Sequence, residues 1–141
     1  MIDAISHVGV WVDDQDEAKA FYTEKLGFEV REDATLEEFG GYRWLTVGPS
    51  DQKDMSILLA YPAPPMFSPE DAETVRALVA KGTLGGGVFE TADCQKTFEE
   101  LSAKGVTFLQ EPADRPYGVE ALFRDDSGNW FSLTQSKWGA G

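Results

Sequence analysis

The only histidine in the chain lies in a stretch whose side chains alternate between two faces. Residues 6–12 read Ser-His-Val-Gly-Val-Trp-Val, and this period of two is typical of a β-strand. The three valines predict a buried face, and the opposite face carries His7, Gly9 and Trp11. An imidazole near its usual pKa of ~6.5 suits proton transfer at neutral pH. The alternative is a histidine that lines a cleft and makes one hydrogen bond.

Three other side chains could take part in chemistry. Glu90 and Glu120 lie on predicted strands in the second half of the chain, and together with His7 they could form an improvised site. The alternative is that both are solvent-facing strand residues. Cys94 falls in the first turn of a predicted helix, where the dipole lowers a thiol pKa. No base lies near it in sequence, so we expect an unreactive thiol.

Large aromatic residues suggest a pocket for a small molecule. Trp11, Trp44, Trp130 and Tyr117 lie on or beside predicted strands, and aromatic faces stack on flat ligands and attract cations. The alternative is that they pack in the core. Arg43 could bind a ligand carboxylate through two hydrogen bonds, or else form a salt bridge in a very acidic protein.

Composition limits the classes of partner. The 141 residues carry 25 acidic and 12 basic side chains, a net charge of −13. This charge disfavours nucleic acid and anionic membranes and is compatible with a cationic ligand. No apolar run approaches the ~20 residues of a membrane span, and the N-terminus lacks the pattern of a signal peptide. With a single cysteine, these features predict a cytoplasmic protein.

The order of predicted elements repeats. Asp14 and Asp93 are candidate helix caps, and Gly27 and Gly105 end the two helices that follow. Each half then reads β-α-β-β-β, which predicts an α+β fold in one domain. The first unit covers about 3–62, a connector with a short helix about 63–83, and the second unit about 84–136. The expected strands are 6–12, 28–31, 42–47, 55–61, 86–91, 106–109, 119–123 and 130–134.

These features resemble the vicinal oxygen chelate superfamily, which includes glyoxalase I, extradiol dioxygenases and bleomycin-resistance proteins. The resemblance lies in "HVGVWV…D…A.AFYTEKLGFEV", in "FRDDSGNWFSL" and in the paired units, over about residues 3–135. It implies paired βαβββ units that form half-barrels around a cleft. It also implies a homodimer, whose clefts in some members are built across the interface. In many members a loop like that of residues 115–118 covers the cleft, so Tyr117 is a lid or a rim residue.

The resemblance also implies four metal-ligand positions, on the first and last strands of each unit. In this chain these positions carry His7, Leu58, Gly86 and Ser132. Leucine, glycine and neutral serine do not replace imidazole and carboxylate around a divalent ion. We therefore expect no metal and no cofactor, and the three vacated positions would open an apolar space around His7.

The sequence thus predicts a cytoplasmic, dimeric, glyoxalase-like protein that binds a small organic molecule, with a degenerate metal site. The alternative is an enzyme, a lyase, isomerase or dioxygenase-like catalyst, that uses a nonstandard metal site or His7 as acid and base. No catalytic residue is assigned. The candidate ligand-binding residues are His7, Trp11, Arg43, Trp44, Leu58, Gly86, Glu90, Tyr117, Glu120, Trp130 and Ser132.

Overall fold

The computed structural model describes residues 1–138, and in it two similar halves follow one another. The first half contains β1 (His7–Trp11), α1 (Gln15–Ala20), a π-helical turn η1 (Phe21–Lys25), β2 (Glu29–Leu36), a 3-10 turn η2 (Glu37–Phe39), β3 (Tyr42–Gly48) and β4 (Ser56–Ala60). The helix α2 (Pro69–Ala80) connects it to β5 (Gly85–Glu90), α3 (Cys94–Ala103), β6 (Phe108–Arg115), β7 (Gly118–Arg124) and β8 (Trp130–Ser136).

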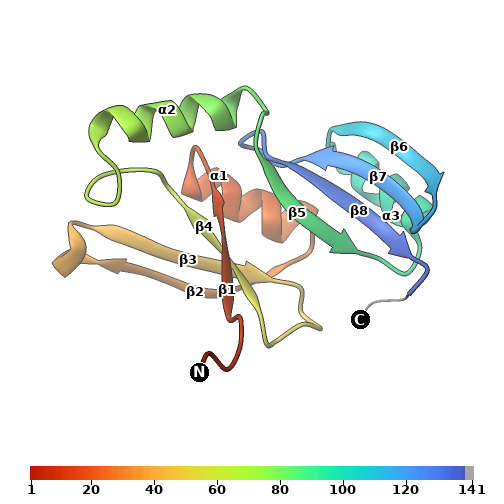
Figure 1. The fold of residues 1–141 in the computed structure, drawn as a ribbon, viewed down its shortest axis with the longest axis horizontal. Helices are drawn as coiled ribbons and strands as arrows, with labels where there is room; N and C mark the ends of the chain where they lie inside the picture. The colour runs from red at the N-terminus through yellow and green to blue at the C-terminus, as the bar shows by residue number, and fades with distance from the viewer. Residues whose placement is uncertain (139–141) are drawn as a thin grey trace.

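Each half forms its own four-stranded sheet, so the α+β fold of paired βαβββ units is confirmed. The strand orders are β1-β4-β3-β2 and β5-β8-β7-β6. In both sheets the first and last strands of the unit pair in parallel, and the remaining pairs are antiparallel. Figure 1 shows the two sheets beside each other, with α1 between them and α2 across one end. The sheets stay separate and open.

The helices begin at the residues that the sequence indicates. The side chain of Asp14 accepts a hydrogen bond from the backbone N–H of Glu17, and Asp93 caps α3 through the N–H of Lys96. Such caps satisfy backbone donors that have no partner inside the helix. These caps fix where α1 and α3 cross the sheets.

The core lies between the inner faces of the two sheets and their helices. Tyr22 of η1 packs edge-on against Phe131 of the second sheet, and Phe28 packs against Phe89. Val10 and Val12 are buried as predicted. Val8 is 41% exposed, so the prediction that all three valines are buried is wrong at this end of β1, which is an edge strand.

Two strands are longer than predicted, and one predicted loop is a tight turn. β2 continues to Leu36 because it pairs with β3 as far as Tyr42, and β6 continues to Arg115 because it pairs with β7. Only residues 116–117 separate β6 from β7. Tyr117 therefore sits in a hairpin turn rather than in a long loop.

A buried carboxylate joins the two units. Asp125 Oδ1 accepts hydrogen bonds from the backbone N–H groups of residues 127, 128 and 129. Its Oδ2 accepts one from the Tyr22 hydroxyl at 2.8 Å and one from Asn129 Nδ2 at 3.0 Å. Asn129 Nδ2 also donates to the carbonyl of Trp11. The turn before the last strand therefore fixes unit two against η1 and β1.

The neighbouring Asp126 should make stability depend on pH. Burial and the charge of Asp125 raise the pKa of Asp126 to about 7 from a reference value of 3.8. The folded chain thus binds this proton more tightly than the unfolded chain, so stability is lost as the pH rises through 7 and is fully present below about 4. Asp126→Asn should raise the free energy of unfolding at pH 8 by about 0.5–1 kcal/mol, a modest value because Asp126 is exposed and solvent screens its charge.

Urea unfolding of both proteins at pH 4 and pH 8 checks this expectation. The gain should be present at pH 8 and absent at pH 4. An equal gain at both pH values would mean that charge on Asp126 is not the cause.

Candidate functional site

Because the inner faces build the core, each sheet has a second face that points away from it. The first outer face carries the side chains of His7, Glu32, Trp44, Thr46, Ser56 and Leu58, with Gly9 between them. The second outer face carries Val88, Glu90, Glu120, Leu122, Arg124, Trp130, Ser132 and Thr134. Most of the predicted site residues lie on these two faces, but on different sheets.

His7 lies at the start of β1 and is surrounded by polar and aromatic groups. Its ring meets the Trp44 ring edge-on, with centroids 5.2 Å apart. Its Nδ1 is 2.8 Å from the Ser6 hydroxyl, and its Nε2 is 3.7 Å from Glu32 Oε1. The arrangement can therefore bind a polar group beside the indole.

Glu32 is the residue of this face that sequence reasoning missed. Its Oε1 accepts a hydrogen bond from Trp44 Nε1 at 2.9 Å and a longer one from the Thr46 hydroxyl at 3.4 Å. The Trp44 hydrogen bond, followed by the charge of His7, lowers the pKa of Glu32. Glu32 is thus a carboxylate that stays ionised at neutral pH.

The second outer face contains a hydrogen-bonded group centred on Glu120. The Tyr117 hydroxyl donates to Glu120 Oε1 at 2.6 Å, and the Ser132 hydroxyl donates to Oε2 at 2.6 Å. The hydroxyls of Ser132 and Thr134 are 2.7 Å apart, and Arg115 Nε is 3.8 Å from Glu120 Oε1. Hydrogen bonding to Glu120 raises the pKa of the Tyr117 phenol. Three of the predicted residues therefore meet here.

Glu90 and Trp130 lie at opposite ends of this face. Glu90 accepts hydrogen bonds from the backbone and hydroxyl of Ser136, near the end of β8. Trp130 begins β8 and is 38% exposed. Val88 and Glu90 share this face, since they pair with Ser132 and Thr134.

Gly86 does not share that face, in contrast to the position that the resemblance implies. The pairing of β5 with β8 shifts between residues 85 and 87, which leaves Gly86 as an extra residue in a bulge. A Cβ at Gly86 would lie 2.2 Å from Cε1 of Phe131. The residue therefore points toward the core of unit two.

Arg43 is held by acidic side chains of its own unit. It forms ion pairs with Asp33 through Nε at 2.9 Å and with Asp16 through Nη1 at 2.6 Å. These hydrogen bonds raise the pKa of Arg43 and lower that of Asp33. The salt-bridge alternative therefore describes this structure, and Arg43 lies away from the first outer face.

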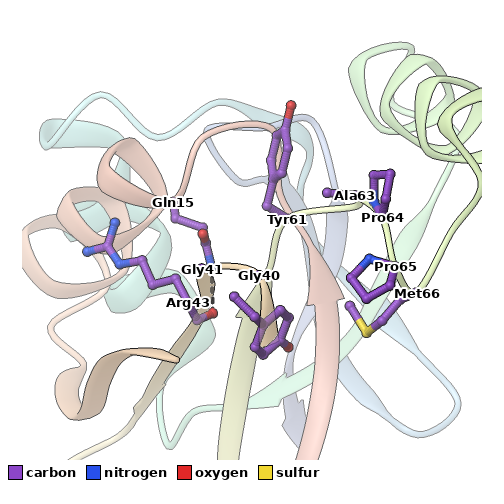
Figure 2. A pocket seen from close by; sticks show the side chains of 10 residues that line it. Gln15, Gly40, Gly41, Arg43, Tyr61, Ala63, Pro64, Pro65 and Met66 are labelled. Atoms are coloured by element: carbon purple, nitrogen blue, oxygen red, sulfur yellow. Dashed lines mark hydrogen bonds between the residues drawn. The ribbon is translucent and has the colours of Figure 1, made fainter. Parts of the chain in front are cut away.

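Arg43 lines a small pocket at the other end of the first unit. The pocket lies between the β2–β3 turn and the start of the connector, and its lining residues are Gln15, Gly40, Gly41, Tyr42, Arg43, Tyr61, Ala63, Pro64, Pro65 and Met66. Figure 2 shows the guanidinium pointing away from the pocket, while Gln15 Nε2 donates to the carbonyl of Arg43. Trp11 also lies off the His7 group, because its ring packs edge-on against Phe67 of the connector.

The four positions of the implied metal site do not fit a metal ion. Only His7 supplies an imidazole, since Leu58 has no donor atom, Gly86 points at Phe131 and the Ser132 hydroxyl donates to Glu120. Across residues 1–138 there is no group of three or more His, Cys, Asp and Glu side chains arranged to hold a metal. Cys94 is buried, its thiol donates to the carbonyl of Leu133, and burial raises its pKa.

Comparison with known proteins identifies the family to which the chain belongs. The family model described as "Glyoxalase/Bleomycin resistance protein/Dioxygenase superfamily" matches residues 4–133. The chain therefore belongs to this superfamily, as its motifs indicated. Within the part of the chain that the structure describes, no helix is both long and apolar enough to cross a membrane.

Several relatives match along most of their length. The crystal structure of UcmS2 is 53% identical, with a TM-score of 0.90, and the match covers 96% of this chain and all of that one. TnmS3, described as an antibiotic binding protein from Streptomyces sp. CB03234, is 31% identical over 96% of this chain and 98% of its own, with a TM-score of 0.75. The uncharacterized protein YurT of Bacillus subtilis (strain 168) is 39% identical over 89% of this chain and 94% of its own.

Proposed function

We propose that this chain forms a homodimer that binds a flat small organic molecule in two clefts. Each cleft lies between the first outer face of one copy and the second outer face of its partner. The observation that carries the proposal is that each outer face presents aromatic, apolar and polar side chains together, as one wall of a ligand pocket would. The inner faces are used in the core. The cytoplasm remains the compartment that we propose.

Exposed apolar surface supports an interface at these faces. Val88 is 69% exposed and lies on β5, an edge strand, and β1, which carries His7, is the edge strand of the first sheet. Trp130 of the same face is 38% exposed, and apolar side chains exposed on one face favour an interaction surface. Ligand pockets are mostly apolar with a few polar groups that fix orientation, and each outer face has this composition.

The relatives support small-molecule binding as the activity. TnmS3 is described as antibiotic binding, and it shares the fold over nearly its whole length. A cleft with Trp44 and His7 on one wall and Leu122 and Trp130 on the other would stack on flat rings. Binding, rather than turnover, is therefore the function that we propose.

Two matched variants test both the binding and the shared cleft. Leu58 and Leu122 are half-buried leucines in central strands of the first and second outer faces. Leu58→Arg and Leu122→Arg should each abolish calorimetric binding of 2-(hydroxymethyl)naphthalene. After subunit exchange, a mixture of the two variants should recover about a quarter of the binding capacity, because half of the dimers are mixed and each has one intact cleft.

Size-exclusion chromatography with light scattering supplies the control that both variants remain dimeric. No recovery in a mixture of dimeric variants would place the cleft within one chain. If the unaltered protein bound no aromatic compound, the proposed function itself would be wrong.

A further inference from the structure

On the first outer face, two side chains that could donate hydrogen bonds to a ligand, Trp44 and Thr46, are already directed at a carboxylate. The Trp44 indole N–H and the Thr46 hydroxyl both point to Glu32 Oε1. The Ser56 hydroxyl accepts from Arg31 and is buried, and His7 Nε2 lies 3.7 Å from Glu32 Oε1. What this face offers to a ligand is chiefly the remaining lone pairs of Glu32.

The second outer face shows the same direction of donation. Tyr117 and Ser132 each donate their single hydroxyl proton to Glu120. Because the proton of Ser132 is used in this way, the 2.7 Å contact between Ser132 and Thr134 requires Thr134 to be the donor. The chain of hydroxyls therefore runs toward Glu120, so that the protons of Tyr117, Ser132 and Thr134 are all used within the protein.

The charges on the two faces also favour a ligand group that donates hydrogen bonds. The carboxylates of Glu32, Glu90 and Glu120 stand on the outer faces. Two guanidinium groups near them are engaged by backbone carbonyls, since Arg124 donates to Gly82 and Gly128, and Arg31 donates to Pro49 and Gln52. Arg115 directs Nε toward Glu120 and donates from Nη2 to Gln110 Oε1. An anionic ligand group placed here would meet like charge and acceptor oxygens that have no proton to share.

We infer that the cleft selects ligands whose polar group donates hydrogen bonds, a protonated amine above all, and rejects carboxylates. This inference rests on the proposed binding function, although the donor pattern holds for each face separately. The aromatic part of the ligand would lie against Trp44, while its ammonium or hydroxyl group would donate to Glu32 or to the Glu120 group. A cation beside an indole gains further stabilisation.

Four naphthalenes that differ only in the substituent at position 2 test this selectivity. The compounds carry aminomethyl, hydroxymethyl, methyl or carboxylate at position 2, and their affinities for the intact protein are measured by calorimetry. We expect the ammonium compound to bind tightest, about tenfold or more above the carboxylate, with the hydroxymethyl compound between them.

Variants that each remove one carboxylate charge show which residue causes the preference for the ammonium compound. Glu32→Gln and Glu120→Gln should each weaken the ammonium compound by about threefold or more and strengthen the carboxylate, because an amide can donate. Glu99→Gln on α3 removes the same charge away from both outer faces, so it should leave the order of the four compounds unchanged.

The outcomes separate the two proposals. Equal binding of the methyl, ammonium and carboxylate compounds overturns the selectivity and leaves the binding function standing. An effect of Glu99→Gln as large as that of Glu32→Gln also overturns it, since net charge would then be the cause. If none of the four compounds binds, the proposed function fails, and the selectivity fails with it.

Discussion

Replacing Asp125 by alanine should lower the free energy of unfolding by about 3 kcal/mol or more, the largest stability effect expected from one side chain here. The change removes the acceptor for three backbone N–H groups, the Tyr22 hydroxyl and Asn129 Nδ2. These donors are largely buried, and a buried donor without a partner loses its hydration without replacement. Urea unfolding followed by circular dichroism measures the loss.

Tyr22→Phe is a milder variant that removes only one of the hydrogen bonds to Asp125. It removes one donor to Asp125 and keeps the ring contacts with Phe28 and Phe131, so a loss of about 1 kcal/mol is expected. The tyrosine hydroxyl is held against Asp125 in a buried site, and burial followed by the Asp125 charge raises its pKa. If Asp125→Ala cost no more than Tyr22→Phe, the backbone hydrogen bonds of the turn would not be stabilising the junction.

Replacing Trp44 by alanine should weaken binding of 2-(aminomethyl)naphthalene by about tenfold or more, since buried tryptophans dominate binding energy at recognition sites. The change removes the ring that contacts His7 and the N–H that orients Glu32. Calorimetry on the intact protein measures the affinity. Trp44→Phe separates the two contributions, because it keeps an aromatic face and removes the hydrogen bond.

Trp138→Ala is the matched control for this experiment. Trp138 is 80% exposed and lies beyond the end of β8, so its removal should leave the affinity unchanged. Unchanged affinity after Trp44→Ala would show that the first outer face does not bind the aromatic ring.

Much of the fold could be predicted from the sequence, because local signals determine it. Capping aspartates, helix-ending glycines and alternating strands occur in the same order in both halves, and the observed elements follow that order. The extra length of β2 and β6 was not predicted, since it depends on pairing with β3 and β7 rather than on the residues themselves.

The candidate site was less predictable, and Glu32 shows why. Regular alternation from Val30 would turn Glu32 to the inner face, beside the core. The pairing with β3 instead shifts between Val30 and Glu32, so that Glu32 lies opposite Thr46 on the outer face. A bulge inserts one residue and reverses which side chains face outward, and nothing in the local composition marks its position.

A bulge also explains why Gly86 does not lie where the resemblance implies. For Arg43 the sequence left two alternatives open. Its guanidinium could bind a ligand carboxylate or a protein carboxylate, and only the fold brings Asp16 and Asp33 within reach. Alternation placed His7 on its strand face, and the family resemblance placed Ser132, in strands whose pairing is regular.

The bulge at Gly86 limits how this protein could be redesigned. An engineer who wished to install a catalytic metal would place histidine at this position, which the family resemblance implies as a metal ligand. The added side chain would instead run into the Phe131 ring, so the substitution would damage the core before it created a ligand. One residue would have to be deleted from the strand first, and the histidine added only afterwards. The bulge is thus a second obstacle to a metal site on this scaffold, in addition to the missing donor atoms.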